Sequence, residues 1–82
     1  MPVARFRIAG RVQGVGFRAA TRAEGARLGL AVQVGNRADG TVEVTAGGDT
    51  GAIEALARWL QHGPPLARVV RVDRLPAVPE AT

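Results

Sequence analysis

Strand-like and helix-like patterns follow one another along this chain in an order that few folds accept. Apolar and polar residues alternate over Val3 to Gly10, Ala31 to Asn36 and Thr41 to Ala46, which is the period of two typical of strands. Helical spacing follows the first and the third of these stretches, and a last strand-like stretch spans 67–75. Right-handed crossovers close this order into a four-stranded antiparallel sheet with both helices on one face. We therefore expect an α+β, ferredoxin-like βαββαβ sandwich.

The first helix is predicted from Phe17 to Leu28, because this stretch is rich in strong helix formers and Gly29 follows it directly. Its inward face is expected to carry residues at helical spacing. These are Phe17, Ala20, Ala23 or Glu24, and Leu28.

The second helix is expected to begin after a cap at Asp49 or Thr50 and to end before the segment 62–65. Its apolar stripe is Ile53, Leu56, Ala57 and Leu60, which Trp59 widens. Glu54 and Arg58 stand four residues apart and are expected to pair on the solvent side. We assign Trp59 to packing and leave His62 without a role, as an exposed residue near a helix end.

Asp39 and Gly40 lie between the second and third strands and predict a tight antiparallel hairpin. Asn36 has the same parity as Val32 and Val34, so its side chain is expected to project toward the helical layer. From position alone, an ordinary turn residue is the favoured interpretation of Asn36.

The chain has 82 residues, 46% of them hydrophobic and none of them cysteine, so one small core must hold the fold without disulfides or thiolate metal sites. We expect a single domain over 1–82, with 76–82 as a loosely held tail. No apolar run is long enough to span a membrane, and charges interrupt the N-terminus where a signal peptide would be apolar. The protein is therefore expected to be cytoplasmic, with no membrane partner.

All 11 basic residues are arginine, and 7 acidic residues leave a formal net charge of +4, which favours anionic partners. Aromatic residues make up only 4% of the chain, too few for a surface that stacks on bases. The outward sheet face would also carry no aromatic residue, which argues against a nucleic-acid partner. That face is predicted to consist of Arg5, Arg7, Gln33, Gly35, Thr41, Glu43 and Thr45.

The segment from Gly10 to Arg18 is a glycine-rich junction between a strand and a helix. Helix N-termini present unpaired backbone N–H groups and a positive dipole end, and glycines at 14 and 16 allow these groups to curl around an anion. Arg18, in the first turn, would add a forked guanidinium. The loop is neither a Walker motif nor a dinucleotide fingerprint. A glycine-rich turn beside a solvated arginine is the alternative interpretation.

This loop, together with Leu28-Gly29-Leu30 and the stretch from Asp39 to Glu43, closely resembles the acylphosphatase family. The resemblance covers nearly the whole chain, and it implies hydrolysis of small acyl phosphates to a carboxylate and inorganic phosphate by a monomer with no cofactor and no metal. It also implies that Arg18 and the loop amides bind the phosphoryl group, and that Asn36 positions the attacking water. The implied substrate-binding residues are Gln13, Gly14, Val15, Gly16, Phe17 and Arg18. The family commonly has Gly-Trp-Val-Arg-Asn where this chain has the segment from Val32 to Asn36.

The residue inventory suits this reaction. An acyl phosphate is a mixed anhydride whose carboxylate leaving group has a pKa near ~4, so it departs without a general acid. The sequence offers no Ser-His-Asp set, no cysteine and no carboxylate cluster, so catalysis is expected to rest on positioning and charge. Two other functions compete with this one. They are a nucleic-acid-binding module and a non-catalytic regulatory domain, such as the acylphosphatase-like domain at the start of hydrogenase maturation factors.

Overall fold

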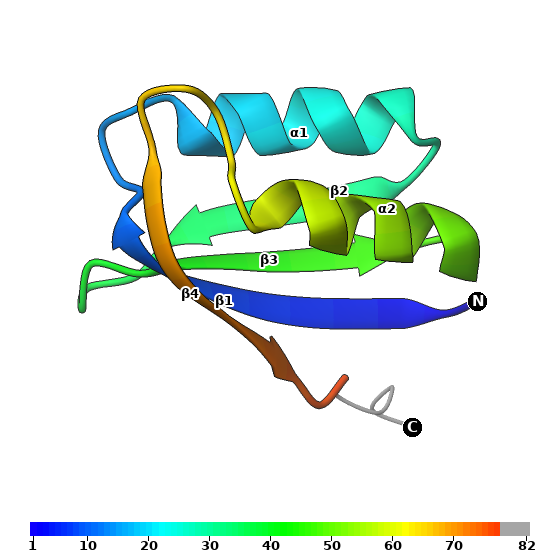
Figure 1. The fold of residues 1–82 in the computed structure, drawn as a ribbon. Helices are drawn as coiled ribbons and strands as arrows, with labels where there is room; N and C mark the ends of the chain where they lie inside the picture. The colour runs from blue at the N-terminus through cyan, green and yellow to red at the C-terminus, as the bar shows by residue number, and fades with distance from the viewer. Residues whose placement is uncertain (78–82) are drawn as a thin grey trace.

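The computed structural model describes residues 1–77 and confirms the predicted order of elements (Figure 1). Each boundary lies within a few residues of its expected place. Of the predicted tail, Pro76 and Ala77 have no regular secondary structure, and 78–82 lie outside the described residues. The elements are β1 (Val3–Arg11), α1 (Phe17–Arg27), β2 (Ala31–Asn36), β3 (Val42–Gly47), α2 (Thr50–Leu60) and β4 (Arg68–Leu75).

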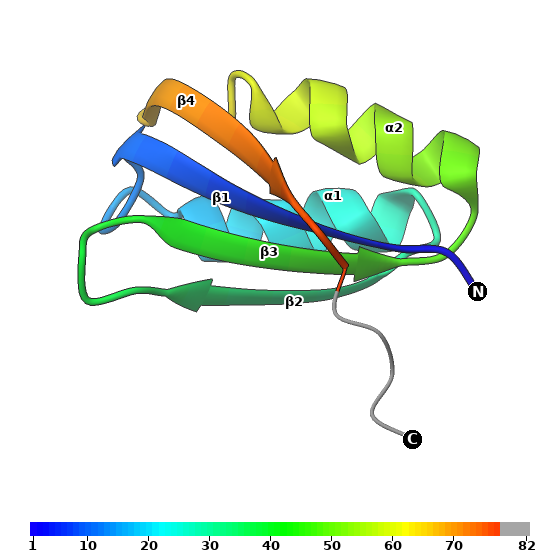
Figure 2. The same cartoon turned by 90° about the horizontal axis from the view of Figure 1, so that it is seen from below.

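The four strands form one antiparallel sheet in the order β2-β3-β1-β4, so β1 and β3 occupy its centre (Figure 2). Both helices cover the same face of the sheet, and the other face is open (Figure 1). The buried side chains of β1 and β3 face the helices and alternate with outward polar ones. They are Ala4, Phe6, Ile8, Val42, Val44 and Ala46. None of the described helices is long and apolar enough to cross a membrane.

The buried face of α1 agrees with the predicted one in part. Phe17 is buried and Leu28 packs against the core, whereas Ala23 is exposed; the other buried residues are Thr21 and Gly25. The Thr21 hydroxyl donates to the carbonyl oxygen of Phe17 at 2.7 Å, so this polar side chain can be fully buried. Gly25 brings the helix against β2, because a Cβ at this position would clash with Cγ2 of Val32. A count of apolar residues could not identify either position.

As predicted, α1 ends just before Gly29, and the turn has the two hydrogen bonds of a Schellman motif. The N–H of Leu30 donates to the Gly25 carbonyl at 2.8 Å, and the N–H of Gly29 donates to the Ala26 carbonyl at 3.0 Å. Leu30 is buried, so the hydrophobic contact expected after the cap is present. The chain therefore turns directly from α1 into β2.

The cap and the buried stripe of α2 are confirmed, since the Asp49 carboxylate accepts from the N–H of Ala52 and Ile53, Leu56 and Leu60 are buried. Trp59 packs against the core, with its ring centroid 6.1 Å from that of Phe17. His62 is exposed.

The prediction of an ion pair between Glu54 and Arg58 is wrong. Glu54 accepts from Arg74 at 2.9 Å instead. Arg74 lies on the helix side of β4, where it also contacts the face of the Phe6 ring, so it reaches α2 across the layers. A pairing rule for one helix cannot include a cation supplied by the sheet.

Candidate active site

The loop between β1 and α1 leaves the start of the helix without a side-chain cap. Gly16 is the N-cap residue, with a left-handed backbone at φ 78° and ψ 17°, and no side chain of residues 1–77 hydrogen bonds to the first turn. The first backbone N–H of the helix that makes a helical hydrogen bond is that of Ala20, which donates to the Gly16 carbonyl at 3.0 Å. The amides of Phe17, Arg18 and Ala19 therefore have no acceptor within the helix and are available to an anion.

The loop carries a second left-handed residue, Gly14, with φ 76°. A Cβ at Gly14 or Gly16 would meet nothing within 4 Å, so backbone conformation and not space favours glycine at both positions. Left-handed residues beside helical ones turn successive N–H groups toward a common point, which is the geometry of anion-binding nests. The sequence-predicted anion loop thus has a backbone suited to that purpose.

A cavity of about 240 Å³ lies against this loop and the first turns of α1. Arg18 and Asn36, which come from α1 and from the end of β2, both line it. The described residues around it include two arginines but no carboxylate and no histidine. The lining residues are Val12, Gly14, Gly16, Phe17, Arg18, Ala19, Arg22 and Asn36. Four members of the predicted substrate-binding segment are thus gathered here, whereas Gln13 and Val15 are not part of this lining.

Asn36 reaches the cavity because of the sheet register. It stands opposite Val42, which is fully buried on the helix side, so the expected orientation of Asn36 toward the helical layer is confirmed. The hairpin begins immediately after it. The N–H of Arg37 donates to the Thr41 carbonyl at 2.8 Å, and the N–H of Gly40 donates to the Arg37 carbonyl at 3.1 Å, which confirms the predicted tight turn.

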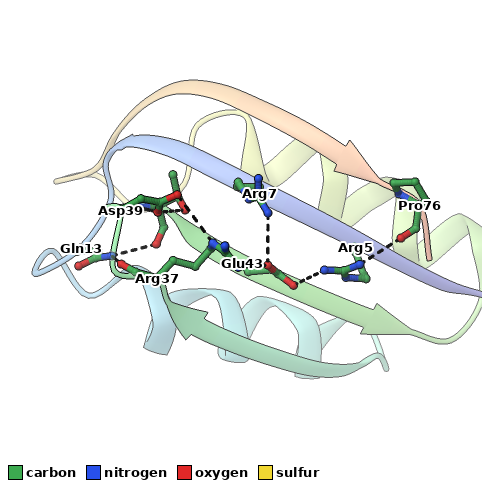
Figure 3. Close-up of polar contacts among 8 residues, drawn as sticks. Arg5, Arg7, Gln13, Arg37, Asp39, Glu43 and Pro76 are labelled. Atoms are coloured by element: carbon green, nitrogen blue, oxygen red, sulfur yellow. Dashed lines mark hydrogen bonds and ion pairs between the residues drawn. The ribbon is translucent and has the colours of Figure 1, made fainter. Parts of the chain in front are cut away.

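The side chain of Gln13 points toward this hairpin (Figure 3). Its Nε2 donates to the carbonyl oxygens of Arg37 at 2.8 Å and of Thr41 at 2.9 Å. The side-chain donors of Gln13 are therefore engaged by the protein itself. Its role in substrate binding remains a prediction, in which the backbone N–H of Gln13, and not its side chain, contacts the substrate.

Arg22 is a cavity-lining residue that the sequence analysis did not single out. It lies four residues after Arg18 on α1, and residues at this spacing share one face of a helix. That spacing is the signal that could have identified it, once Arg18 was assigned to the site. The hydrogen bond from an Nη of Arg22 to the Val34 carbonyl, at 3.5 Å, spans the gap between α1 and β2.

The outward face of the sheet carries the polar residues expected from alternation, but its charges are paired (Figure 3). The Glu43 carboxylate accepts from Arg5 at 2.6 Å and from Arg37 at 2.9 Å, and Arg7 is 4.0 Å away. The hydrogen bond from Arg5, followed by the positive charges of Arg5 and Arg37, lowers the pKa of Glu43. This face therefore presents a partly neutralised network and not a free basic patch.

Comparison with known proteins agrees with the fold. A family model described as acylphosphatase matches residues 4–80. The acylphosphatase of Xanthomonas oryzae pv. oryzae (strain MAFF 311018) is 50% identical over 80 residues, which cover 96% of this chain and 91% of that protein. The acylphosphatase of Thermococcus kodakarensis is 53% identical over 70 residues, which cover 85% and 77%.

Solved structures give the same result. The crystal structure of acylphosphatase from Bacillus subtilis matches with a TM-score of 0.88 and 36% identity, covering 92% of this chain and 83% of that one. A structure of full-length HypF in the phosphate- and nucleotide-bound form matches with a TM-score of 0.72 and 28% identity, but this chain covers only 10% of it.

The sandwich and its cavity define a ferredoxin-like α+β protein with a basic, glycine-rich site at the N-terminus of its first helix. The chain belongs to the acylphosphatase family, and it is a hydrolase of that family. Membership supports hydrolysis of acyl phosphates.

Proposed function

We propose that this chain hydrolyses small acyl phosphates without a metal ion or cofactor, with the loop 13–18 holding the phosphoryl group, Arg18 neutralising it and Asn36 positioning the water. One observation carries the proposal. Arg18 and Asn36 line the same cavity, and that cavity also borders the free end of α1. An anion-holding group and a water-orienting group therefore face one reaction space.

The reaction needs few other groups from the protein. The oxygen of water attacks phosphorus, the bond between phosphorus and the acyl oxygen breaks, and the carboxylate leaves with the electron pair. The water proton passes to a phosphoryl oxygen, so no protein base is needed. The transition state spreads negative charge over the equatorial oxygens, where the guanidinium of Arg18 and the loop amides stabilise it. The cavity lining described above supplies these groups and contains no carboxylate to repel the phosphoryl group.

The experiment that tests the proposal is hydrolysis of benzoyl phosphate by purified protein in the presence of a chelator. We expect turnover that the chelator does not reduce, with inorganic phosphate as a competitive inhibitor, because the product occupies the same amides and guanidinium as the substrate. Activity that is abolished by the chelator and restored by magnesium would overturn the metal-independent mechanism. Absence of turnover would favour a non-catalytic domain of the same fold.

A phosphate titration followed by amide chemical shifts locates the site independently of catalysis. The largest shifts are expected from Gln13 to Arg18. If they occur instead on the outward sheet face around Glu43, the site is misplaced. The expected partners are an acyl phosphate and inorganic phosphate, with no nucleic acid and no membrane. The remaining expectations, a cytoplasmic monomer with one domain over 1–82, are tested by light scattering on the purified protein and by fractionation of its source cells.

A further inference from the structure

Arg22 places a second guanidinium in the cavity that Arg18 and Asn36 share. Six other arginines of the described chain form ion pairs with carboxylates: Arg5, Arg7, Arg27, Arg37, Arg71 and Arg74. Within residues 1–77, no carboxylate lies within ion-pair distance of Arg18 or Arg22. The two arginines of the cavity thus keep their positive charge available to a ligand.

The position of Arg22 separates it from the proposed phosphoryl site. Four residues of helix rise about 6 Å, so the backbone of Arg22 lies one turn beyond that of Arg18. The free amides and the field of the helix dipole are confined to the first turn. A phosphoryl group held by the loop and Arg18 already has charge-assisted donors, and Arg22 is left for a different part of the substrate.

The contact of Arg22 with β2 engages only one Nη group of its guanidinium. Its hydrogen bond to the Val34 carbonyl is exposed and, at 3.5 Å, at the outer limit for such a bond. A guanidinium has five N–H donors in a planar fork, so a bidentate face remains for a carboxylate. A role for Arg22 solely as a tether between α1 and β2 would rest on this one weak contact.

We propose that Arg22 is a specificity-determining residue that binds a second anionic group on the acyl chain, so that acyl phosphates with a terminal carboxylate are the favoured substrates. This inference rests on the proposed function. The phosphorus and the terminal carboxylate carbon of succinyl phosphate lie about 6 Å apart in an extended chain, which matches the helical rise between the two arginines. Butyryl phosphate has the same acyl chain length but ends in a neutral methyl group.

The test compares kcat/KM for succinyl phosphate and butyryl phosphate in the parent protein and in Arg22→Gln. We expect the ratio of the two values to fall on the order of tenfold in Arg22→Gln, the size typical of one charge-assisted hydrogen bond. Arg22→Lys, which keeps the charge but loses the fork, is expected to retain part of the preference. Arg58→Gln removes the same charge from an exposed position on α2 and is expected to leave the ratio unchanged.

Three results would overturn the inference. An equal fall for both substrates, together with weaker inhibition by inorganic phosphate, would place Arg22 on the phosphoryl group. If the ratio of the two kcat/KM values is the same in the parent protein and in Arg22→Gln, Arg22 does not bind the acyl chain, and the proposed function is unaffected. If the parent protein hydrolyses neither substrate, the proposed function is wrong, and this inference is wrong with it. Thermal melting of each variant establishes that the proteins compared are folded.

Discussion

The side-chain amide of Gln13 donates a hydrogen bond to the carbonyl oxygen of Thr41 at 2.9 Å and joins segments 28 residues apart in the sequence. A second bond from the same nitrogen reaches the Arg37 carbonyl (Figure 3). Thr41 follows the turn, and Arg37 directly follows Asn36. The glutamine therefore connects the loop that holds the proposed phosphoryl site to the hairpin that carries the proposed water-positioning residue.

Gln13→Ala is expected to lower turnover of benzoyl phosphate about tenfold, with a smaller change in inhibition by inorganic phosphate. Both hydrogen bonds to the hairpin are lost, so Asn36 is held less well relative to the loop, and small misplacements of reacting groups are costly. Steady-state kinetics with phosphate as inhibitor measures both effects. Gln33→Ala, an exposed change on the outward face of β2, is the matched control. Unchanged turnover in Gln13→Ala would show that the loop and hairpin hold their positions without this contact.

The close approach of α1 and β2 gives a prediction about stability. Alanine in place of glycine usually stabilises a helix interior by about 1 kcal/mol. Gly25→Ala is expected to do the opposite and to lower the free energy of unfolding by about 1–3 kcal/mol, because the added methyl group clashes with Val32. The double variant Gly25→Ala, Val32→Ala is expected to recover part of the loss. Urea denaturation of the three proteins is the measurement, and a stabilised Gly25→Ala would contradict the packing described here.

Glu43 links stability to pH on the outward face. Arg5 lowers its pKa in the folded state, so the unfolded chain binds this proton more readily. The stabilisation is complete above the ordinary glutamate pKa of about 4.5 and is lost as pH falls through the lower folded value. Glu43→Gln is therefore expected to be less stable than the parent at pH 7 by on the order of 1 kcal/mol, with the difference shrinking in acid.

Denaturation of Glu43→Gln and the parent protein at pH 7, 5 and 3 measures this effect. Asp73→Asn, which breaks a single exposed pair with Arg71 near the sheet edge, is the control and is expected to have a smaller effect. A stability difference for Glu43→Gln that stays constant over this pH range would rule out the ionisation as its cause.

Much of the fold could be predicted because its signals are local. The period of two oriented Asn36 correctly, and Gly29 and the Asp39-Gly40 pair marked the end of α1 and the hairpin. The contacts of Gln13 and Glu54 could not be predicted in this way. Each joins elements that the sheet order and the layer packing bring together, and neither follows from spacing within one segment.

The candidate site was predictable to the same extent. Arg18 and the loop glycines belong to one short segment, and the resemblance supplied Asn36 as their partner. Arg22 shares a helix face with Arg18, but the sequence does not show that α1 lies against β2, where Gly25 allows a close approach and carries no hydrophobic signal. Side chains that reach a site through packing are thus less visible in the sequence than those supplied by a motif.

The central claim assigns different tasks to the two cavity residues, and the kinetics of Asn36→Ala test it most directly. In the proposed mechanism Arg18 holds the charged phosphoryl group in the ground state and more strongly in the transition state, so Arg18→Ala is expected to lower turnover and phosphate affinity together. Neither residue belongs to the buried core, so both variants should melt near the parent temperature.

The decisive measurement is turnover of benzoyl phosphate by Asn36→Ala, made alongside the inhibition constant of inorganic phosphate for the same protein. In the proposed mechanism Asn36 orients a neutral water, so we predict a loss of turnover on the order of 100-fold or more with little change in phosphate affinity. Loss of phosphate binding in Asn36→Ala, with binding retained in Arg18→Ala, would contradict the assignment.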